Sequence, residues 1–237
     1  MQVLIPLGGN GTRLKEITKE KIPKGFLFFN GEPLLAYHMK MFIKAGITKF
    51  ILDFDRQEYI DLFNKYKSEG LIPKAEIITN RREIPEDGNY HDVPFASFLS
   101  KDIKKAVSVD DTIFLLSDIF FYYRDLILLI KSYCNSCSSI FATYEWTDVN
   151  MIVGISNPPI WAGLAIFSKS DACHVIDAGE TYYCPTDIQV IDNIEDKGGK
   201  PCFIKLSKCV NINTRVDYNY AKVLFEKLEE EDVNSVF

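Results

Sequence analysis

The chain begins with MQVLIPLGGNGTRL, residues 1–14, and this stretch decides the fold. Residues 2–7 form an apolar run without alternation, the pattern of a strand that is buried on both faces. Three glycines follow within four positions, at Gly8, Gly9 and Gly11. Glycine permits positive φ and carries no Cβ, so a ligand can approach the backbone closely. Outward-facing N–H groups and the forked cation of Arg13 suit phosphate oxygens, and the stretch therefore predicts a nucleotide-phosphate site.

Two well-known phosphate-binding loops do not fit these residues. A P-loop requires G-x-x-x-x-G-K-[ST], and the chain contains no such run. The dinucleotide fingerprint requires G-x-G-x-x-G, and Leu14 stands where its third glycine belongs. A plain glycine-rich turn between a strand and a helix is the alternative interpretation. We favour the phosphate site and keep the plain turn open.

Strands and helices alternate through the first half of the chain. Apolar runs predict strands at 2–7, 26–29, 50–52, 76–79 and 112–116, and one-sided apolar patterns predict helices around 33–45, 59–66 and 95–106. The polar residues 80–92 predict a loop over the functional site. The less regular second half predicts strands at 138–144, 151–155, 164–167 and 202–206, with helices at 186–197 and 216–230. The alternation favours one Rossmann-like α/β domain over residues 1–237, with three α/β/α layers and a mostly parallel mixed sheet.

The composition excludes several classes of protein. A net charge of −6 and the lack of a basic cluster argue against nucleic-acid or anionic-membrane partners. The first apolar run is too short for a signal peptide, and runs such as 126–130 are too short to span a bilayer. The six cysteines include Cys134-x-x-Cys137 but no second pair or nearby histidine pair, so we expect reduced thiols and no zinc. We therefore expect a cytoplasmic protein.

Three motifs at this end resemble the signature of the NTP:sugar-1-phosphate nucleotidyltransferases. They are GGxGTRL at 8–14, Pro23-Lys24 and NGEPLL at 30–35, in the family's order and spacing. The resemblance implies transfer of a nucleoside monophosphate from an NTP to a sugar 1-phosphate or related phosphoalcohol, with release of pyrophosphate. It also implies Mg²⁺ as cofactor and a smaller subregion in the second half of the chain that holds the acceptor.

The resemblance assigns roles to particular residues. Arg13 and Lys24 match the family's cations on the triphosphate, and with Asp118 they form the expected catalytic set. The expected nucleotide-binding residues are Leu7, Gly8, Gly9, Gly11, Thr12, Arg13 and Lys24, and Gly163 is placed with the acceptor.

Asp118 is the strongest candidate from the residues themselves. It follows the apolar strand 112–116, and open α/β sheets bind ligands at the carboxyl ends of their strands. A Mg²⁺ ion that bridges two anionic substrates needs hard oxygen ligands such as this carboxylate. The alternative is an exposed turn aspartate that caps the helix beginning near Tyr122.

The second expected metal ligand comes from the resemblance alone. The family's Asp-x-Asp-Thr-x-x-Asp run corresponds to residues 211–217, and position makes Asn213 the ligand, with a neutral amide oxygen. Thr214 and Asp217 are more simply a helix cap and a first-turn acid, which is the interpretation that we favour for Asp217. His38 lies on an apolar helix face and is expected in the core. No serine, histidine or cysteine is arranged as a covalent nucleophile.

The chain departs from the family pattern in two places. Residues 92–97, DVPFAS, replace the Gly-Thr-Ala run that reads the base, and no Glu-Lys pair lies between Gly154 and Gly163 to contact a sugar. Base and acceptor therefore stay open. A second function is also left open, namely a catalytically inactive module that binds a nucleotide or nucleotide sugar for regulation. A nucleotide-sugar glycosyltransferase ranks third, because residues 117–120 carry one acid rather than an Asp-x-Asp motif. A homo-oligomer is also left open.

Overall fold

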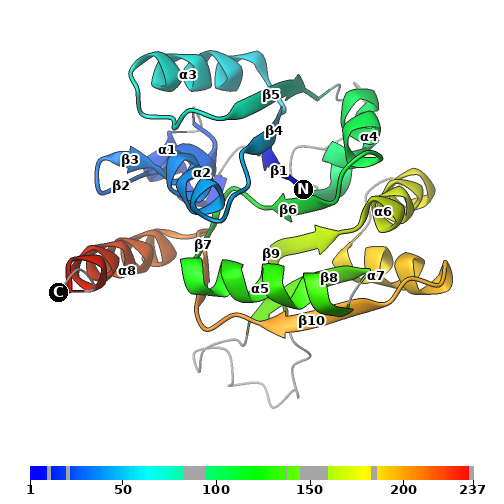
Figure 1. Ribbon diagram of the computed structural model, residues 1–237. Coiled ribbons are helices and arrows are strands. Elements are labelled where there is room, and N and C mark those ends of the chain that lie inside the picture. Colours follow the sequence, from blue (N-terminus) through cyan, green and yellow to red (C-terminus); the bar gives the residue numbers. More distant parts are fainter. Residues whose placement is uncertain are drawn as a thin grey trace.

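A seven-stranded sheet runs through the computed structural model of the protein (Figure 1). The structure describes residues 1–9, 12–19, 22–82, 94–136, 138–144, 160–182 and 186–234. In spatial order the strands are β10 (Pro201–Lys205), β8 (Ser139–Tyr144), β9 (Ile160–Phe167), β6 (Thr112–Leu115), β1 (Gln2–Leu7), β4 (Lys49–Phe54) and β5 (Glu76–Arg81).

The sheet is mixed and mostly parallel, as the alternation in the sequence predicts. β1 pairs in parallel with β4 and β6, β4 with β5, and β8 with β10. β9 runs antiparallel to both of its neighbours, β6 and β8. The carboxyl ends of β1, β4, β5 and β6 consequently lie at one edge of the sheet, where open α/β folds bind ligands.

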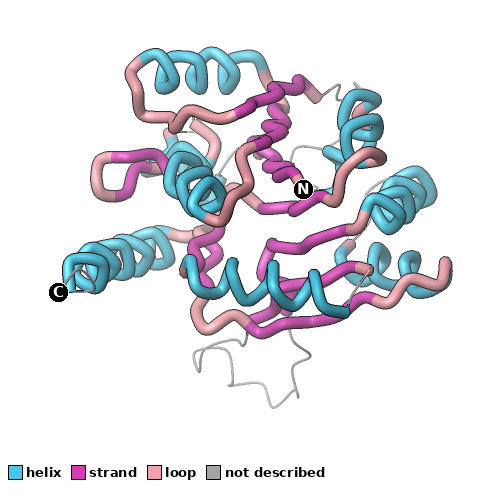
Figure 2. Tube along the Cα trace, in the orientation of Figure 1, coloured by secondary structure: helices cyan, strands magenta, loops and turns pink. Residues whose placement is uncertain are grey.

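Helices cover both faces of this sheet (Figure 2). On one face, α2 (Leu34–Lys44), α3 (Gln57–Ser68) and α5 (Tyr123–Ser136) pack in one apolar cluster with Val3, Ile5 and Leu7. On the other face, a second cluster joins Leu4 to the 3₁₀ segment η4 (Pro94–Leu99) and to α4 (Lys101–Val107), α6 (Lys169–Tyr182) and α7 (Asp187–Asp196). Successive residues of β1 thus point to opposite faces, which explains why its sequence is apolar without alternation. The expected three-layer α/β/α architecture is confirmed.

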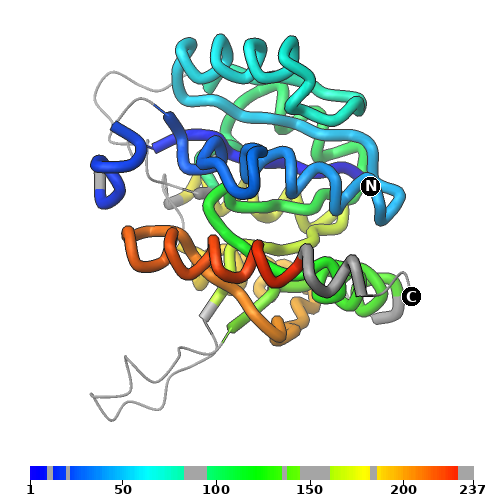
Figure 3. The backbone as a smooth tube through the Cα atoms, turned by 90° about the vertical axis from the view of Figure 1, so that its left-hand side faces the viewer, coloured from blue at the N-terminus to red at the C-terminus, as the bar shows by residue number. Residues whose placement is uncertain are grey.

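The last helix, α8 (Arg215–Asn234), packs in a third apolar cluster. It lies below α2 in Figure 3. Two small antiparallel ladders meet it there: β2 (Phe28–Phe29) with β3 (Glu32–Pro33), and β7 (Ile119–Phe121) with β11 (Cys209–Asn211). Phe225 of α8 stacks on Phe29 at 4.6 Å between ring centroids and contacts Phe120 at 4.7 Å. Among the described residues, no helix is long and apolar enough to cross a membrane.

Several predicted boundaries differ from the structure. The strand expected at 26–29 is the 3₁₀ turn η2 (Lys24–Phe26) followed by the two-residue strand β2, because the N–H groups of Phe26 and Leu27 donate within that turn, at 2.9 and 3.0 Å. Asn30 and Gly31 then turn the chain back at φ +47° and +82°. The helix expected at 95–106 is divided into η4 and α4, with Ser100 between them. Helix α6 was not predicted. Of the loop expected at 80–92, residues 80 and 81 belong to β5, while 83–92 lie outside the described residues, as does the strand expected at 151–155.

The glycine turn after β1 is held from the neighbouring strand. The ladder pairs Leu7 with Phe54, so Asp55 lies beside the start of the turn. Gly9, at φ +88°, donates its N–H to Asp55 Oδ2 at 2.9 Å. A Cβ on Gly8 would lie 3.1 Å from Asp55 Cγ, so any larger residue there would crowd the Asp55 side chain. The expectation that the N–H groups of the turn face outward is therefore wrong for Gly9, because a buried carboxylate that follows β4 accepts that proton.

Asp55 itself is stabilised by a neighbouring cation. Its side chain is fully buried, and Arg56 Nε and Nη2 each donate to it at 3.2 Å. The Arg56 guanidinium also lies over the Tyr59 ring, 4.7 Å from its centroid. The buried negative charge is thus partnered on both sides, as a desolvated carboxylate must be.

Asp55→Ala should destabilise the protein, because it leaves the Gly9 N–H without its charged acceptor. We expect a loss of about 2 kcal/mol in the free energy of unfolding. Urea denaturation at pH 7 measures it. The matched control is Asp61→Ala, since Asp61 accepts from Gln57 on the exposed face of α3 and should change stability by no more than about 0.5 kcal/mol. Equal stability of the two variants would contradict the role of Asp55 in holding the glycine turn.

His38 is buried in the core, as its position on α2 predicts. Its side chain has no exposed area, and Nε2–H donates to the carbonyl oxygen of Ile119 at 2.7 Å. Because a carbonyl can only accept, Nδ1 carries no proton, and this atom has no hydrogen-bond partner. Burial lowers the pKa of His38 from 6.5 to about 4, against the smaller opposite effect of the Ile119 bond.

The free energy of unfolding should therefore fall as the pH is lowered from 6.5 to about 4. Below pH 6.5 the unfolded chain protonates His38 while the native state does not until about pH 4. The expected loss from this group is at most about 3 kcal/mol. Urea denaturation of the wild type and His38→Gln between pH 7 and 4 checks it. The wild type should lose more stability than the variant over this range, and parallel curves would refute the assignment.

Candidate functional site

The central feature of the site is a ladder that joins two distant parts of the chain. Asp118 lies between β6 and β7, and its carbonyl oxygen accepts from the Ile212 N–H at 2.8 Å. β7 pairs with β11, with Ile119 opposite Asn211. The ladder therefore brings Asn213 to Asp118 at the carboxyl edge of the sheet.

Lys24 completes the site from a third segment. Its ammonium Nζ donates to Asp118 Oδ2 at 2.7 Å and to Asn213 Oδ1 at 2.6 Å. The Lys24 and Asp118 side chains are 17% and 19% exposed, so solvent and a ligand can still reach them. Three residues expected at the functional site thus share one contact.

Gly25 explains how Lys24 comes so close to the sheet. A Cβ on Gly25 would lie 2.8 Å from Leu7 Cδ2 and 2.9 Å from the Cβ of Ser117, the residue before Asp118. No larger residue fits between β1 and this turn without displacing one of them. The motif Pro23-Lys24 is therefore placed by the glycine that follows it.

Asp217 caps α8 rather than facing the site. Its Oδ2 accepts from the Asn213 N–H at 3.1 Å and from the Thr214 N–H at 2.7 Å, while Thr214 Oγ1 accepts from the Asp217 N–H at 3.3 Å. The interpretation of Thr214 as the helix cap and of Asp217 as a first-turn acid is confirmed, and the bond to Asp217 fixes the backbone of Asn213. The carboxylate of Asp118, in contrast, bonds to Lys24 rather than to the first turn of α5.

The oxygens around Lys24 Nζ suit a hard divalent cation. A carboxylate oxygen and an amide oxygen converge on one point, and Mg²⁺ is usually held by one or two such protein oxygens together with substrate phosphates. Within the described part of the chain, no group of three or more acidic, histidine or cysteine side chains could form a complete metal cage. The donor set therefore fits Mg²⁺ bound jointly with a ligand.

The other expected site residues differ in how exposed they are and in what they contact. Leu7 is fully buried, and Arg13, in the 3₁₀ turn η1 (Thr12–Leu14) ahead of α1 (Lys15–Thr18), is exposed at the same edge. Gly11 and the Thr12 side chain lie outside the described residues.

Gly163, expected near the acceptor, has φ +79°, and its missing Cβ leaves room for Leu116. The Leu116 N–H donates to the Gly163 carbonyl oxygen at 2.8 Å. Packing against Leu116 is thus a sufficient reason for glycine at that position.

A buried ionic cluster at the same edge has no counterpart among the residues selected from the sequence. Asp53 Oδ2, in β4, accepts from Arg82 Nε at 2.8 Å and from Ser97 Oγ, while Asn80 Nδ2 donates to Asp53 Oδ1 at 2.6 Å. The cluster binds the end of β5 to η4. An aspartate inside the apolar strand at 49–54 is the one signal in the sequence that could have indicated it.

A neighbouring thiol is unsuited to nucleophilic chemistry. Burial, with a smaller effect from the nearby Asp118 charge, raises the pKa of Cys209 to about 12. The thiol is therefore protonated at neutral pH and cannot act as a thiolate nucleophile. Neither Cys209 nor the neutral core residue His38 is therefore suited to act as a covalent nucleophile.

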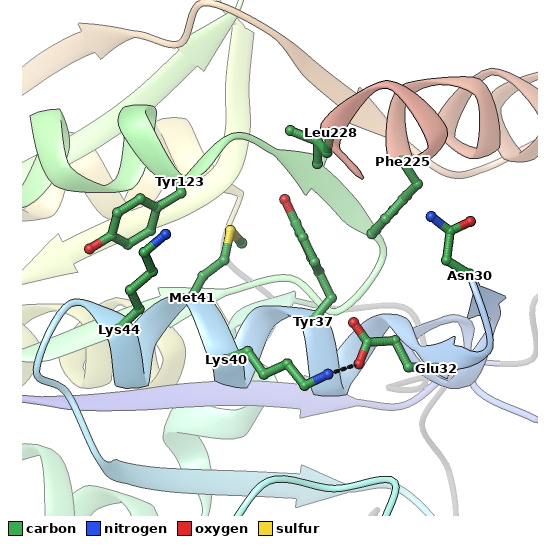
Figure 4. A pocket seen from close by; sticks show the side chains of 9 residues that line it. All are labelled: Asn30, Glu32, Tyr37, Lys40, Met41, Lys44, Tyr123, Phe225 and Leu228. Carbon is green, nitrogen blue, oxygen red and sulfur yellow. Dashed lines mark hydrogen bonds and ion pairs between the residues drawn. The ribbon is translucent and has the colours of Figure 1, made fainter. Parts of the chain in front are cut away.

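A cavity of about 450 Å³ lies apart from these residues, between α2, α5 and α8 (Figure 4). Its walls combine aromatic and apolar side chains with two lysines, and the lining residues are Asn30, Glu32, Tyr37, Lys40, Met41, Lys44, Tyr123, Phe225 and Leu228. Lys40 pairs with Glu32, and Lys44 lies over the Tyr123 ring. None of the expected site residues lines this cavity, so it is separate from the contact that Lys24 makes at the edge of the sheet.

Solved structures share this fold over almost the whole chain. A putative glucose-1-phosphate thymidylyltransferase from Bacillus anthracis superposes with a TM-score of 0.74 at 16% identity, covering 95% of both chains. The inositol-1-phosphate CTP transferase from T. maritima superposes with a TM-score of 0.71 at 21% identity, covering 97% of this chain and 96% of its own. At these identities the likeness establishes the fold.

Sequence comparison identifies the family. A 52-residue stretch is 40% identical to the probable glucose-1-phosphate cytidylyltransferase of Bacillus subtilis (strain 168); it is 22% of this chain and 20% of that protein. The match thus spans about a fifth of the curated relative. The profile of the nucleotidyl transferase family matches residues 2–149, which contain the glycine turn, Lys24 and Asp118. The chain therefore belongs to the nucleotidyl transferase family.

Proposed function

We propose that the protein transfers a nucleoside monophosphate from an NTP to a sugar 1-phosphate or a related phosphoalcohol, releasing pyrophosphate, in a Mg²⁺-dependent reaction. The observation that carries this proposal is the contact of Lys24 with both Asp118 and Asn213 at the carboxyl edge of the sheet. Family membership and the names of the relatives support the class of reaction.

The reaction joins two anions, so charge neutralisation is its main requirement. A phosphate oxygen of the acceptor attacks the α-phosphorus, and the bond from this phosphorus to the pyrophosphate oxygen breaks. Asp118 and Asn213 would hold Mg²⁺, which supplies positive charge between the two substrates when it is bound. The chain itself contributes position and electrostatic stabilisation.

Two cations are available for the phosphates. Lys24 ends in an ammonium on a flexible four-carbon stem, which can move from Asp118 to a phosphate oxygen. Arg13 is exposed beside the glycine turn, and its guanidinium suits bidentate phosphate contacts. We assign the triphosphate to this turn, with Leu7, Gly8, Gly9, Gly11 and Thr12 shaping it, and the acceptor to the side of Gly163. Gly9 contributes shape rather than a free donor, because its N–H is bound to Asp55.

Base and acceptor are left to experiment. Of the residues that replace the family's base-reading run, Ser97 is already bound to Asp53 and Arg82 inside the protein, which leaves it unsuited to reading a base. The relatives are named for cytidylyl and thymidylyl transfer and for glucose and inositol phosphates. We also propose a cytoplasmic location, which the free thiols of Cys134, Cys173, Cys202 and Cys209 support.

Pyrophosphate release from a panel of substrates tests the proposal. The five common nucleoside triphosphates are combined with glucose 1-phosphate, mannose 1-phosphate, inositol 1-phosphate and phosphocholine, with Mg²⁺ present. At least one pair should turn over. Asp118→Asn should lower kcat by about 100-fold or more, since it removes the carboxylate charge from the site.

The control is Asp110→Asn, which removes a carboxylate that pairs with Lys49 at 3.1 Å, away from the site. It should keep the wild-type rate. Full activity of Asp118→Asn, or no turnover by the wild type on any pair, would contradict the proposal. Nucleotide binding without turnover would instead favour a regulatory module.

A further inference from the structure

The ammonium of Lys24 occupies the place where a divalent cation would meet the protein. Its Nζ is 2.7 Å from Asp118 Oδ2 and 2.6 Å from Asn213 Oδ1, the two oxygens assigned to the metal. A cation bound to both oxygens would lie within contact distance of Nζ, and the two positive charges would repel each other strongly. Lys24 in this position and a cation on these oxygens therefore exclude one another.

The charge balance of the contact makes the exclusion effective. Asp118 contributes one negative charge, Lys24 one positive charge, and Asn213 none, so the three side chains are formally neutral. A free divalent cation gains little attraction from a neutral site and must displace an ammonium that makes two short hydrogen bonds there. A triphosphate changes this balance, because its negative oxygens offer the ammonium a better partner.

We propose that Lys24 closes the metal site to free cations and opens it when a triphosphate arrives. This inference rests on the proposed function. Lys24 exchanges Asp118 and Asn213 for phosphate oxygens, and the vacated oxygens then take the divalent cation. Metal and nucleotide therefore bind with positive coupling, and each raises the affinity for the other by the same factor.

The local structure allows this exchange through the side chain alone. Gly25 is packed between Leu7 and Ser117, so the backbone at Lys24 is fixed beside the sheet. Asn213 is fixed by the Asp217 cap and Asp118 by the bond from Ile212. The lysine stem is the flexible part of the contact. Asn213 is also suited to this arrangement, because a second carboxylate would leave a net negative charge that attracts free cations.

Mn²⁺ binding without nucleotide tests the proposal directly, with Mn²⁺ as the probe and electron paramagnetic resonance of the free ion as the readout. Lys24→Met keeps an unbranched side chain that is one atom shorter and removes its charge. It should bind Mn²⁺ at least tenfold more tightly than the wild type. The gain should disappear in Lys24→Met/Asp118→Asn, which assigns it to this site.

Lys49→Met is the matched control, because it removes a lysine that also pairs with an aspartate, Asp110, outside the site. It should bind Mn²⁺ as the wild type does. Thermal unfolding gives a second readout: Mn²⁺ should raise the Tm of Lys24→Met more than that of the wild type. If Lys24→Met does not fold, Lys24→Gln takes its place.

Equal Mn²⁺ affinity of Lys24→Met and the wild type would overturn the inference. So would tight Mn²⁺ binding by the wild type that Asp118→Asn abolishes, since the site would then be open without nucleotide. Wild-type turnover in the substrate panel, combined with either result, would refute this inference and leave the proposed function standing. Tighter Mn²⁺ binding by Lys24→Met without wild-type turnover would retain the exclusion by Lys24 and refute the function.

Discussion

The contact of one ammonium with two oxygens, Lys24 with Asp118 and Asn213, is the interaction on which the rest of the site depends. Its three residues come from the 3₁₀ turn η2, the segment between β6 and β7, and the segment between β11 and α8. Each is held by a different local contact. Close packing at Gly25 holds Lys24, the β7–β11 ladder holds Asp118, and the bond to Asp217 holds Asn213. Two buried aspartates at the same edge form ion pairs within the protein, Asp55 with Arg56 and Asp53 with Arg82.

The sequence was informative wherever the signal was local. An apolar run that ends in glycines identifies β1 and its turn, because both features lie within a dozen residues. The alternation of apolar runs and one-sided helices predicts the parallel part of the sheet. Lys24 and Asn213 could be selected because the resemblance supplied motifs at fixed spacing, and Asp118 because it follows the apolar strand 112–116. The structure places Lys24 within hydrogen-bond distance of both Asp118 and Asn213.

What the sequence could not supply depends on contacts between distant residues. Asp55 looks like an ordinary turn residue, and only the register of β1 with β4 shows that it accepts the Gly9 N–H. Asp53 and Arg82 likewise form a buried pair, and the aspartate inside the apolar strand at 49–54 indicates neither its partner nor its burial. Helix α6 carries Ala172, Ala178 and Gly179 on positions that pack closely against other elements, and small residues give a weak helical pattern.

The central claim is that Asp118 and Asn213 form one metal-binding pair from which Lys24 must depart. A crystal structure with Mn²⁺ and a non-hydrolysable α,β-methylene analogue of an accepted triphosphate tests it most directly. The account predicts an anomalous peak about 2.2 Å from an oxygen of each residue, with Lys24 Nζ bound to a phosphate oxygen. A peak elsewhere, or Lys24 still bonded to both oxygens beside a bound nucleotide, would contradict it.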